Sequence, residues 1–407
     1  MKKLYTLAAA AVLLSMNASA AGADASKATL MFELGLVDKF GVEATVEAYN
    51  AVHPTLAMCG DKLVMNLGNG TAPVYVNAAT GEKLGEIALG DADAAGSVAS
   101  DDKGNMLVCN LAPGKTDFKA YIMSAVDGTP EAYIDWYNTS SLPIGKRIHI
   151  LGDLRGDAVI VATCDGVKGI TGSNSFVRWT VAGGVVGEPE VCKIEGVGYW
   201  SVGTGDTKVV AKSMDKADGY FMGYYTSSNY LRHINGTTLA QDMAMTFADG
   251  NSWGLANKNA DCRDYNDVNY TAYMQQGIWP TWGMPGVVYL YDTTSLDKFT
   301  GDVASSPALV ASLAMANMSD TYADSDNSMG DVLIVRGENA MNVYFVTNSH
   351  LGLGGYTIPA DMSGVVDVVV TDAAPEYFDM QGRRVQEPTA CGIYIERRGT
   401  KVTKVIK

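Results

Sequence analysis

The segment GDKLVMNLGNGTAPVYVNAATG, residues 60–81, contains two short apolar runs bounded by glycine, asparagine or aspartate. The first run follows the pair Gly60-Asp61, and the second, PVYVNAATG, closes on residues that favour turns. Gly, Asn and Asp tolerate the positive φ angles that tight connections between strands require. The segment therefore predicts short β-strands joined by tight turns.

The same two-part pattern occurs six times along the chain. Further copies of the first part begin at Gly104, Gly156, Gly205, Gly250 and Gly330. The matching second parts are AYIMSAVDG (120–128), FVRWTVAGG (176–184), YLRHINGTT (230–238), VYLYDTTSL (288–296) and VYFVTNSHL (343–351). A repeat of about 50 residues built from short strands and Gly-rich turns is typical of one propeller blade. We expect an all-β, six-bladed β-propeller, with seven blades as a variant and a β-sandwich or a two-domain β protein as the alternatives.

The first 20 residues have the features of a signal peptide. MKK is a basic start, LYTLAAAAVLLSM is an apolar core too short to span a bilayer, and Ala18-Ser19-Ala20 resembles a cleavage site. No later apolar run is long enough for a transmembrane segment. We expect an exported protein that reaches the cell surface, the medium or the periplasm.

The charge distribution argues against two classes of binding partner. The chain has 30 Lys and Arg against 45 Asp and Glu, a formal net charge of −15. The acidic excess lies in the body, whereas residues 375–407 are net basic. Nucleic acids and anionic lipids bind basic patches, so neither is an expected partner.

The last 33 residues, PEYFDMQGRRVQEPTACGIYIERRGTKVTKVIK, differ from the repeats. A strand EYFDM, a turn QGRRV, a second strand GIYIE and a final basic strand follow one another. This order resembles the C-terminal sorting domain of proteins exported by the type IX secretion system of Gram-negative bacteria, although the tail is shorter than the family's full domain. The resemblance implies secretion machinery as a partner of the tail. Together with the signal peptide and the repeat, it predicts three parts: a signal peptide (1–20), a propeller (21–364) and a sorting-type β tail (365–407).

The spacing of the repeat is broken once, between Gly250 and Gly330. The extra text lies between Asn257 and Gly286 and is rich in aromatic and acidic residues. Those residues are Tyr265, Tyr270, Tyr273, Trp279, Trp282, Asp261, Asp264 and Asp267. Flat aromatic rings stack on sugars, and carboxylates accept hydrogen bonds from sugar hydroxyls. We expect an inserted loop that binds a glycan, with a loop that only packs on the propeller as the alternative.

A second acidic segment, YADSDNSMGD at 322–331, carries Asp324, Asp326 and Asp331. Hard oxygen ligands at this spacing suit Ca²⁺, although the twelfth position after Asp324 is Val335 and not the glutamate of an EF-hand. The segment predicts either a weak calcium site or a solvated turn. No other cofactor is expected.

No catalytic residue is predicted. GNSWG at 250–254 matches a nucleophile elbow, but it coincides with a repeat glycine and no helix pattern follows it. SDDKG at 100–104 resembles the Ser-x-Asp-x-Gly turn of Asp-box propellers such as sialidases, in which Asp102 would accept backbone N–H bonds.

The cysteines and histidines show no metal-binding spacing. Cys109 and Cys164 lie in apolar strands as small buried residues, and at most one disulfide is expected among the six cysteines. His149 and His233 are expected in strands.

These patterns predict a non-catalytic binding module whose partner is a glycan or a surface protein. Two alternatives stay open: a glycan hydrolase or lyase that uses exposed acids, and a structural or adhesive envelope protein. The sequence offers no pair of carboxyl groups at the separation that glycoside hydrolysis needs.

Overall fold

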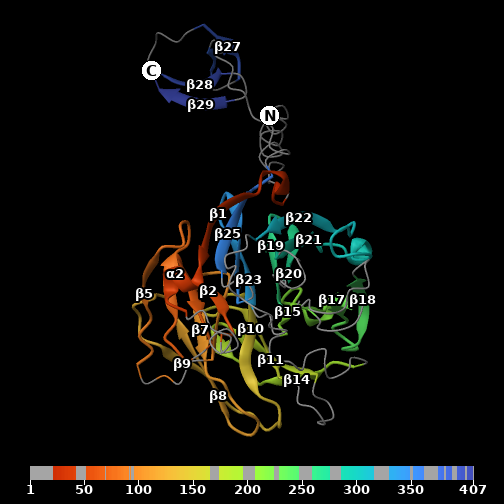
Figure 1. Cartoon of the computed structure of the whole chain (residues 1–407). Helices are drawn as coiled ribbons and strands as arrows, with labels where there is room; N and C mark the ends of the chain where they lie inside the picture. Colours follow the sequence, from red (N-terminus) through yellow and green to blue (C-terminus); the bar gives the residue numbers. More distant parts are fainter. Residues whose placement is uncertain are drawn as a thin grey trace. The chain divides into compact units, whose positions relative to one another are not determined.

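The computed structural model describes residues 22–42, 52–68, 70–90, 92, 96–165, 174–195, 207–223, 229–246, 259–275, 286–315, 330–348, 352–361, 375–379, 382–386, 392–398 and 401–406. The chain divides into two compact units (Figure 1). One unit contains residues 21–361, and the other contains residues 1–20 and 362–407.

Within the described residues, the larger unit contains six antiparallel sheets, five of which are built from strands that follow one another in the chain. The first sheet contains β2 (Thr55–Cys59), β3 (Lys62–Asn66), β4 (Val74–Asn77) and β5 (Lys83–Glu86); the second, β6 (Ser97–Ser100), β7 (Met106–Cys109), β8 (Asp117–Met123) and β9 (Glu131–Tyr137); the third, β10 (Ile144–Gly152), β11 (Ala158–Cys164), β12 (Ser175–Ala182), β13 (Val185–Val186) and β14 (Glu190–Lys193). The fourth contains β15 (Val209–Ala211), β16 (Tyr220–Gly223), β17 (Asn229–Ile234) and β18 (Gln241–Thr246); the fifth, β19 (Asn259–Tyr265), β20 (Val268–Gln275), β21 (Val287–Asp292) and β22 (Leu309–Ala314); the sixth, β23 (Gly330–Arg336), β24 (Ala340–Thr347), β25 (Gly352–Pro359) and β1 (Thr29–Gly35).

The first strands of the six sheets contact one another in a cycle. The order of contact is β2, β6, β10, β15, β19, β23 and again β2. β2 and β6 are completely buried, whereas the fourth strand β5 is largely exposed. Strands buried on both faces are apolar runs without alternation, as TLAMC in β2 shows. The all-β architecture is propeller-like.

The sixth sheet is completed by the start of the chain. β1 pairs antiparallel with β25, with Thr29 opposite Thr357 and Gly35 opposite Gly352, and Figure 1 shows the two strands side by side. Beyond β1, Ala23 bridges Ala360. The first and last strands of the larger unit are therefore neighbours.

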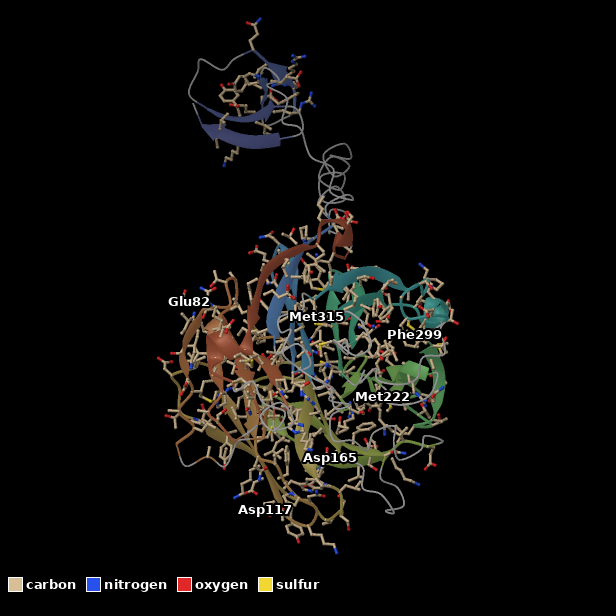
Figure 2. The ribbon with its side chains drawn as sticks, in the orientation of Figure 1. Glu82, Asp117, Asp165, Met222, Phe299 and Met315 are labelled. Carbon is tan, nitrogen blue, oxygen red and sulfur yellow. The ribbon has the colours of Figure 1, made fainter. Side chains whose placement is uncertain are left out.

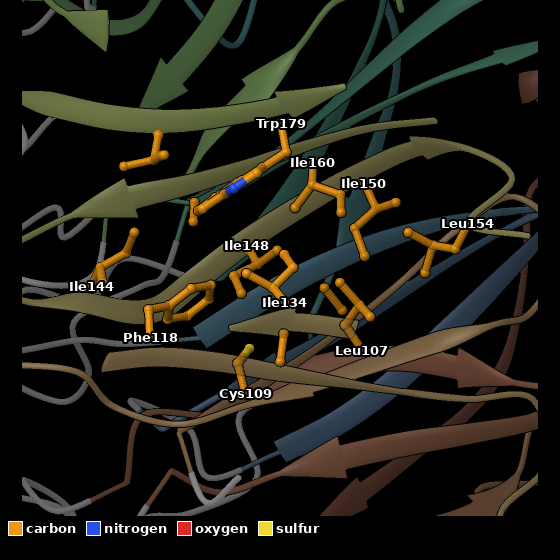
Figure 3. Close-up of a cluster of buried hydrophobic side chains, with 14 of the residues drawn as sticks. Leu107, Cys109, Phe118, Ile134, Ile144, Ile148, Ile150, Leu154, Ile160 and Trp179 are labelled. Carbon is orange, nitrogen blue, oxygen red and sulfur yellow. The ribbon is translucent and has the colours of Figure 1, made fainter. Parts of the chain in front are cut away.

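The core lies between successive sheets. One cluster joins the second and third sheets, where Phe118 of β8 stacks on Trp179 of β12 with ring centroids 5.7 Å apart (Figure 3). Figure 2 shows the contrast between the surface residues Glu82 and Asp117 and the buried Met222. In this cluster the facing sides of the second and third sheets are buried against each other.

The repeat glycines do not all occupy equivalent turns. Gly60, Gly104 and Gly156 lie between the first and second strands of their sheets, as the repeat predicts. Gly330 instead begins the first strand β23, so that expectation was wrong for this copy. Gly205 and Gly250 lie outside the described residues.

The second parts of the repeat are strands in every copy. The first five are the third strands of their sheets, β4, β8, β12, β17 and β21. VYFVTNSHL is the second strand β24, because the first part of this copy, from Gly330, is the first strand β23.

The predicted insertion is not a loop where it is described. Asn259–Tyr265 and Val268–Gln275 are β19 and β20, the first hairpin of the fifth sheet. Their turn, Asn266-Asp267, has φ angles of 46° and 64°, a conformation that Asn and Asp tolerate. In the fifth sheet the turn between the first two strands is therefore Asn266-Asp267 and not a Gly-Asp pair.

Helical structure is sparse. The helical segments in the described part of the chain are η1 (Ala25–Lys27), α2 (Leu36–Phe40), η3 (Lys216–Asp218) and η4 (Leu296–Lys298). Within the described residues, none of the helices has the length and apolarity needed to cross a membrane.

The tail forms a separate antiparallel sheet in the order β27, β26, β28, β29. The strands are β26 (Glu376–Phe378), β27 (Arg384–Val385), β28 (Ile393–Arg398) and β29 (Lys401–Ile406). Glu376 pairs with Arg384 and Arg397, and the Arg397 guanidinium lies 5.3 Å from the Phe378 ring.

Candidate functional site

Three ionisable side chains are buried together on the first strands. Asp261 and Arg263 belong to β19 and lie on one face of it, because residues two apart on a strand point the same way. His149 comes from β10. Asp261 Oδ1 lies 3.0 Å from Arg263 Nη1 and 3.1 Å from His149 Nε2.

The surroundings in the cluster lower the pKa values of both Asp261 and His149. Burial by itself raises the pKa of Asp261, but Arg263, the hydrogen bond to His149 and Lys208 lower it below the usual range. Burial and the nearby Arg263 lower the pKa of His149 to about 4. The carboxylate is therefore ionised and the imidazole neutral at pH 7.

Hydrogen-bond geometry also disfavours a charged His149. The Ala211 backbone N–H donates to Nδ1 at 3.1 Å, and Arg263 Nη1 lies 2.5 Å from Nε2. Protonation would add a second ring N–H that faces one of these donors.

A second buried ion pair links different sheets. Lys208 Nζ, just before β15, lies 2.9 Å from Asp331 Oδ1 on β23. The other carboxylate oxygen accepts a hydrogen bond from the Leu56 backbone N–H at 3.0 Å. Asp331 is therefore engaged by an ammonium group and an amide, which is not the environment of a calcium ligand.

Asp101 stabilises the turn between β6 and β7. Its Oδ1 accepts hydrogen bonds from the backbone N–H groups of Lys103 and Asn105, both at 2.8 Å, and its Oδ2 accepts one from Leu154. The turn role predicted for Asp102 thus belongs to its neighbour.

Asp102, which lies in a turn of the second sheet, instead contacts residues of three other sheets. It accepts a hydrogen bond from the Gly152 backbone N–H at 2.8 Å, and its oxygens lie 3.2 Å from Arg263 Nε and 2.9 Å from Arg336 Nη2. Its carboxylate is held between two guanidinium groups.

A pocket of about 300 Å³ opens where these first strands end. Met58, Asp102, Lys103, Arg263 and Arg336 are among its lining residues, and we call it the arginine pocket. Arg263 is buried, whereas the side chain of Arg336 is 35% exposed. The pocket therefore has one buried guanidinium, that of Arg263, and one that solvent and ligands can reach, that of Arg336.

A second pocket, of about 490 Å³, lies between the second and third sheets. Its lining includes Trp136 on β9, Ser140 and Ser141 in the following connection, Ser175 on β12 and Lys193 on β14, and we call it the tryptophan pocket. Trp136 is half-buried and packs edge-on against Trp179, with centroids 5.8 Å apart. An aromatic ring, hydroxyl groups and an ammonium thus line one cavity.

The structure does not assemble the predicted sugar-binding residues on an open surface. Tyr265, Tyr270 and Tyr273 are buried in the hairpin of β19 and β20. The Tyr270 hydroxyl accepts a hydrogen bond from the Ala23 backbone N–H at 2.8 Å. Asp261 is buried in the ionic cluster, so these four residues offer no exposed face to a sugar.

The other predicted acids have different positions. Asp264 is exposed and accepts a hydrogen bond from Asn269 Nδ2 at 2.7 Å, and Asp267 is exposed in the turn. Trp279, Trp282, Asp324 and Asp326 lie outside the described residues, and their roles stay predictions. Within the described ranges, no group of three His, Cys, Asp or Glu residues could hold a metal ion.

The cysteines that the structure describes are buried free thiols. They are Cys59, Cys109, Cys164, Cys192 and Cys262. Burial raises the pKa of Cys109, Cys164 and Cys262 to about 12. The prediction that Cys109 and Cys164 are small buried residues is confirmed.

Sequence patterns missed both pockets. The tryptophan pocket combines residues from two different repeats, so no local motif contains it. The signal for the arginine pocket was weak: two positive residues, Arg263 and Arg336, that interrupt strongly acidic or apolar strand segments.

Comparison with known proteins gives a family and a fold. The model of a domain of unknown function, DUF8500, matches residues 32–359. No curated protein matches the chain. A crystal structure of a DUF4623 family protein from Bacteroides eggerthii is similar, with a TM-score of 0.59, 14% identity, and coverage of 84% of this chain and 77% of that chain.

Two more distant structures are also similar. An exo-β-1,3-galactanase from Phanerochaete chrysosporium with β-1,3-galactotriose has 13% identity and a TM-score of 0.33, with 64% of this chain and 58% of that chain covered. Hydrazine synthase from Kuenenia stuttgartiensis has 13% identity and a TM-score of 0.43, with 76% and 84% covered. These two resemblances carry no argument about activity.

The family match begins in β1 and ends in β25, so it includes the strands that complete the sixth sheet. Since it covers most of the 407 residues, the protein belongs to the DUF8500 family.

Proposed function

We propose that this protein is an exported, non-catalytic glycan-binding module built as a six-bladed β-propeller. The cycle of first strands supports six sheets as six blades. The observation that carries the binding function is the tryptophan pocket, in which Trp136 lies beside serine and threonine hydroxyls. Such a pocket suits a sugar ring, which has an apolar face and polar edges.

The electrostatics favour binding over hydrolysis. A glycoside hydrolase needs a carboxylic acid that stays protonated until it donates its proton, and therefore a raised pKa. The pKa of buried Asp261 is lowered instead. Asp102 and Asp331 are each engaged in ion pairs within the protein.

The test is a glycan microarray, with calorimetry on the best ligand and analysis for released sugar. We expect saturable binding without product. Ser141→Phe should fill the tryptophan pocket while leaving the core packing of Trp136 intact, and should weaken binding at least tenfold. Trp136→Leu should have a similar effect.

Tyr137→Ala is the matched control. Tyr137 is the next residue on β9, is 54% exposed and does not line the pocket, so its loss should leave affinity unchanged. Full binding by a correctly folded Ser141→Phe protein would exclude this pocket, and release of reducing sugar would support the hydrolase alternative.

The route of export forms part of the proposal. The tail folds as its own sheet, which supports a separate role as a sorting signal. In the native host, deletion of residues 375–407 should retain the folded protein in the periplasm. If the truncated protein still reached the cell surface or the medium, the sorting role would be wrong.

A further inference from the structure

The arginine pocket has an uneven charge inventory. Its lining contains three cations, Arg263, Arg336 and Lys103, and two carboxylates, Asp101 and Asp102. The surrounding protein is acidic, with a net charge of −15. The pocket thus has a local excess of one positive charge. It should attract a small anion, whereas the acidic protein around it should repel one.

Both carboxylates are engaged by groups of the protein itself. Asp101 accepts three backbone N–H bonds. Asp102 Oδ2 accepts one from Gly152 and pairs with Arg336, whereas its buried Oδ1 lies 3.2 Å from Arg263 Nε and accepts no hydrogen bond from the described residues. The negative charge of Asp102 is therefore already faced by two arginines.

The cations retain donor capacity. A guanidinium carries five N–H groups. Among the described residues, Arg336 pairs with Asp102 and otherwise makes one long contact of 3.4 Å, from Nη1 to the Asp264 carbonyl. Lys103 is exposed, and its ammonium contacts no carboxylate in the described part of the chain. Both can therefore donate hydrogen bonds to a ligand.

The volume of the pocket and its apolar lining residues limit the kind of ligand that it can bind. A volume of about 300 Å³ is at the lower end of small-molecule pockets, which suits one small molecule and not an extended oligomer. Met58, Ile334 and Val335 add apolar surface beside the charged groups. A carboxylate with a compact organic body matches this combination, because guanidinium groups bind carboxylates through paired hydrogen bonds.

We propose that the arginine pocket binds the carboxylate of a small organic monoanion, with Arg336 and Lys103 as the direct donors and Arg263 as a positioning residue that fixes Asp102. The site is separate from the tryptophan pocket, so it does not depend on the proposed glycan function. A sugar acid and a short aliphatic acid share this chemistry.

The experiment is calorimetric titration of the full chain at pH 7 and low salt with paired probes. Glucuronate is compared with glucose, isovalerate with isovaleramide, and sodium sulfate serves as a mineral anion. We expect saturable binding of at least one carboxylate and none of its neutral analogue. The acid that binds identifies whether the source is a sugar acid or an aliphatic acid, and equal binding of both would make the carboxylate the sole determinant.

Variants locate the binding. Arg336→Gln and Lys103→Met should each weaken it at least tenfold, while Asp102 keeps Arg263 and the Gly152 N–H as partners. Arg155→Gln is the control, since this exposed arginine also pairs with a carboxylate, Glu131, at 2.9 Å but lines neither pocket. Thermal unfolding of each variant checks that it is folded.

Three results would overturn the proposal. They are the absence of saturable binding for both carboxylates, sulfate binding as tight as that of either carboxylate, and unchanged affinity in folded Arg336→Gln protein. Glycan binding in the tryptophan pocket would be unaffected by any of them.

Discussion

His149 shows how burial beside a positive charge makes a protein sensitive to acid, because burial and Arg263 lower the pKa of its imidazole. An isolated histidine titrates near pH 6.5, whereas His149 in the folded protein titrates near 4. Between these values the unfolded chain binds a proton that the native protein excludes. Native stability therefore falls as the pH decreases through this window.

We predict a loss of about 3 kcal/mol in the free energy of unfolding as the pH falls from 7 to 4, since each pKa unit corresponds to about 1.4 kcal/mol. His149→Gln removes the titrating group and should flatten the profile over this window. Asp261, whose pKa is lowered, adds a further loss only below about pH 4. Urea unfolding at several pH values measures both, and equal slopes in wild type and variant would refute the assignment.

Gly145 tests steric constraint at one position. Its φ is +114°, and an added Cβ would lie 2.1 Å from the Asn110 carbonyl oxygen. Gly145→Ala should lower stability by at least about 2 kcal/mol, because a strained backbone and a clash combine.

Gly183 provides the comparison for Gly145. Its φ is also positive, +54°, but no atom lies within 4 Å of the added Cβ. Gly183→Ala should lower stability by only about 1 kcal/mol, the conformational term alone. Equal losses in thermal or urea unfolding would show that the clash at Gly145 relaxes.

At the scale of strands and sheets, the sequence predicted the strands better than it predicted the turns between them. Apolar runs such as VYLYD in β21 are strands because β-branched and aromatic residues favour extended backbone. The register of the repeat was harder to predict, since Asn266-Asp267 performs in the fifth sheet the role that Gly60-Asp61 performs in the first. Several turn chemistries satisfy the same geometry, so a glycine is not a fixed landmark.

The candidate sites could not be predicted because they depend on packing between sheets. Trp136 and Lys193 meet in one pocket although they belong to different repeats. Conversely, the sequence suggests that Tyr265 and Tyr273 are exposed and could bind a ligand, but in the structure both are buried. Local composition does not show which face of a strand another sheet will cover.

The pairing of β1 with β25 predicts a viable circular permutant. The Asp361 N–H donates to the Gly22 carbonyl, so the end of the last strand already lies beside the start of the first. A chain that begins at Val52 and joins residue 361 to 22–42 through a short glycine linker should fold to the same sheet content. Its melting temperature should lie within a few degrees of that of the chain spanning residues 22–361.

The matching negative variant omits residues 22–42 altogether. It leaves β25 as an open edge and removes Phe32 and Leu36 from a core cluster, so it should aggregate or unfold. Circular dichroism and size-exclusion chromatography distinguish the outcomes. A permutant as unstable as the deletion would show that chain order, and not pairing alone, is required.

At the scale of the whole molecule, the larger unit should not need the tail. Its six sheets contact one another in a complete cycle within residues 21–361. Deletion of residues 375–407 should therefore leave the cooperative unfolding transition of the larger unit unchanged within about 2 °C, because no contact of that cycle is removed. Calorimetry measures this, and a broadened or strongly lowered transition would show that the tail supports the sheets.

The closing strand also sets an order in time. During synthesis, β1 is made roughly 300 residues before β25, the strand that it must pair with. Until then its backbone groups have no native partner and Phe32 lacks its ring contact with Tyr344, and unpaired strands of this kind promote association between chains. Non-local pairing is slow in proportion to the chain that must be closed. The nascent protein therefore lacks the pairing of β1 with β25 during most of its synthesis. Protection from proteases and from self-association begins only when the last repeat has been made.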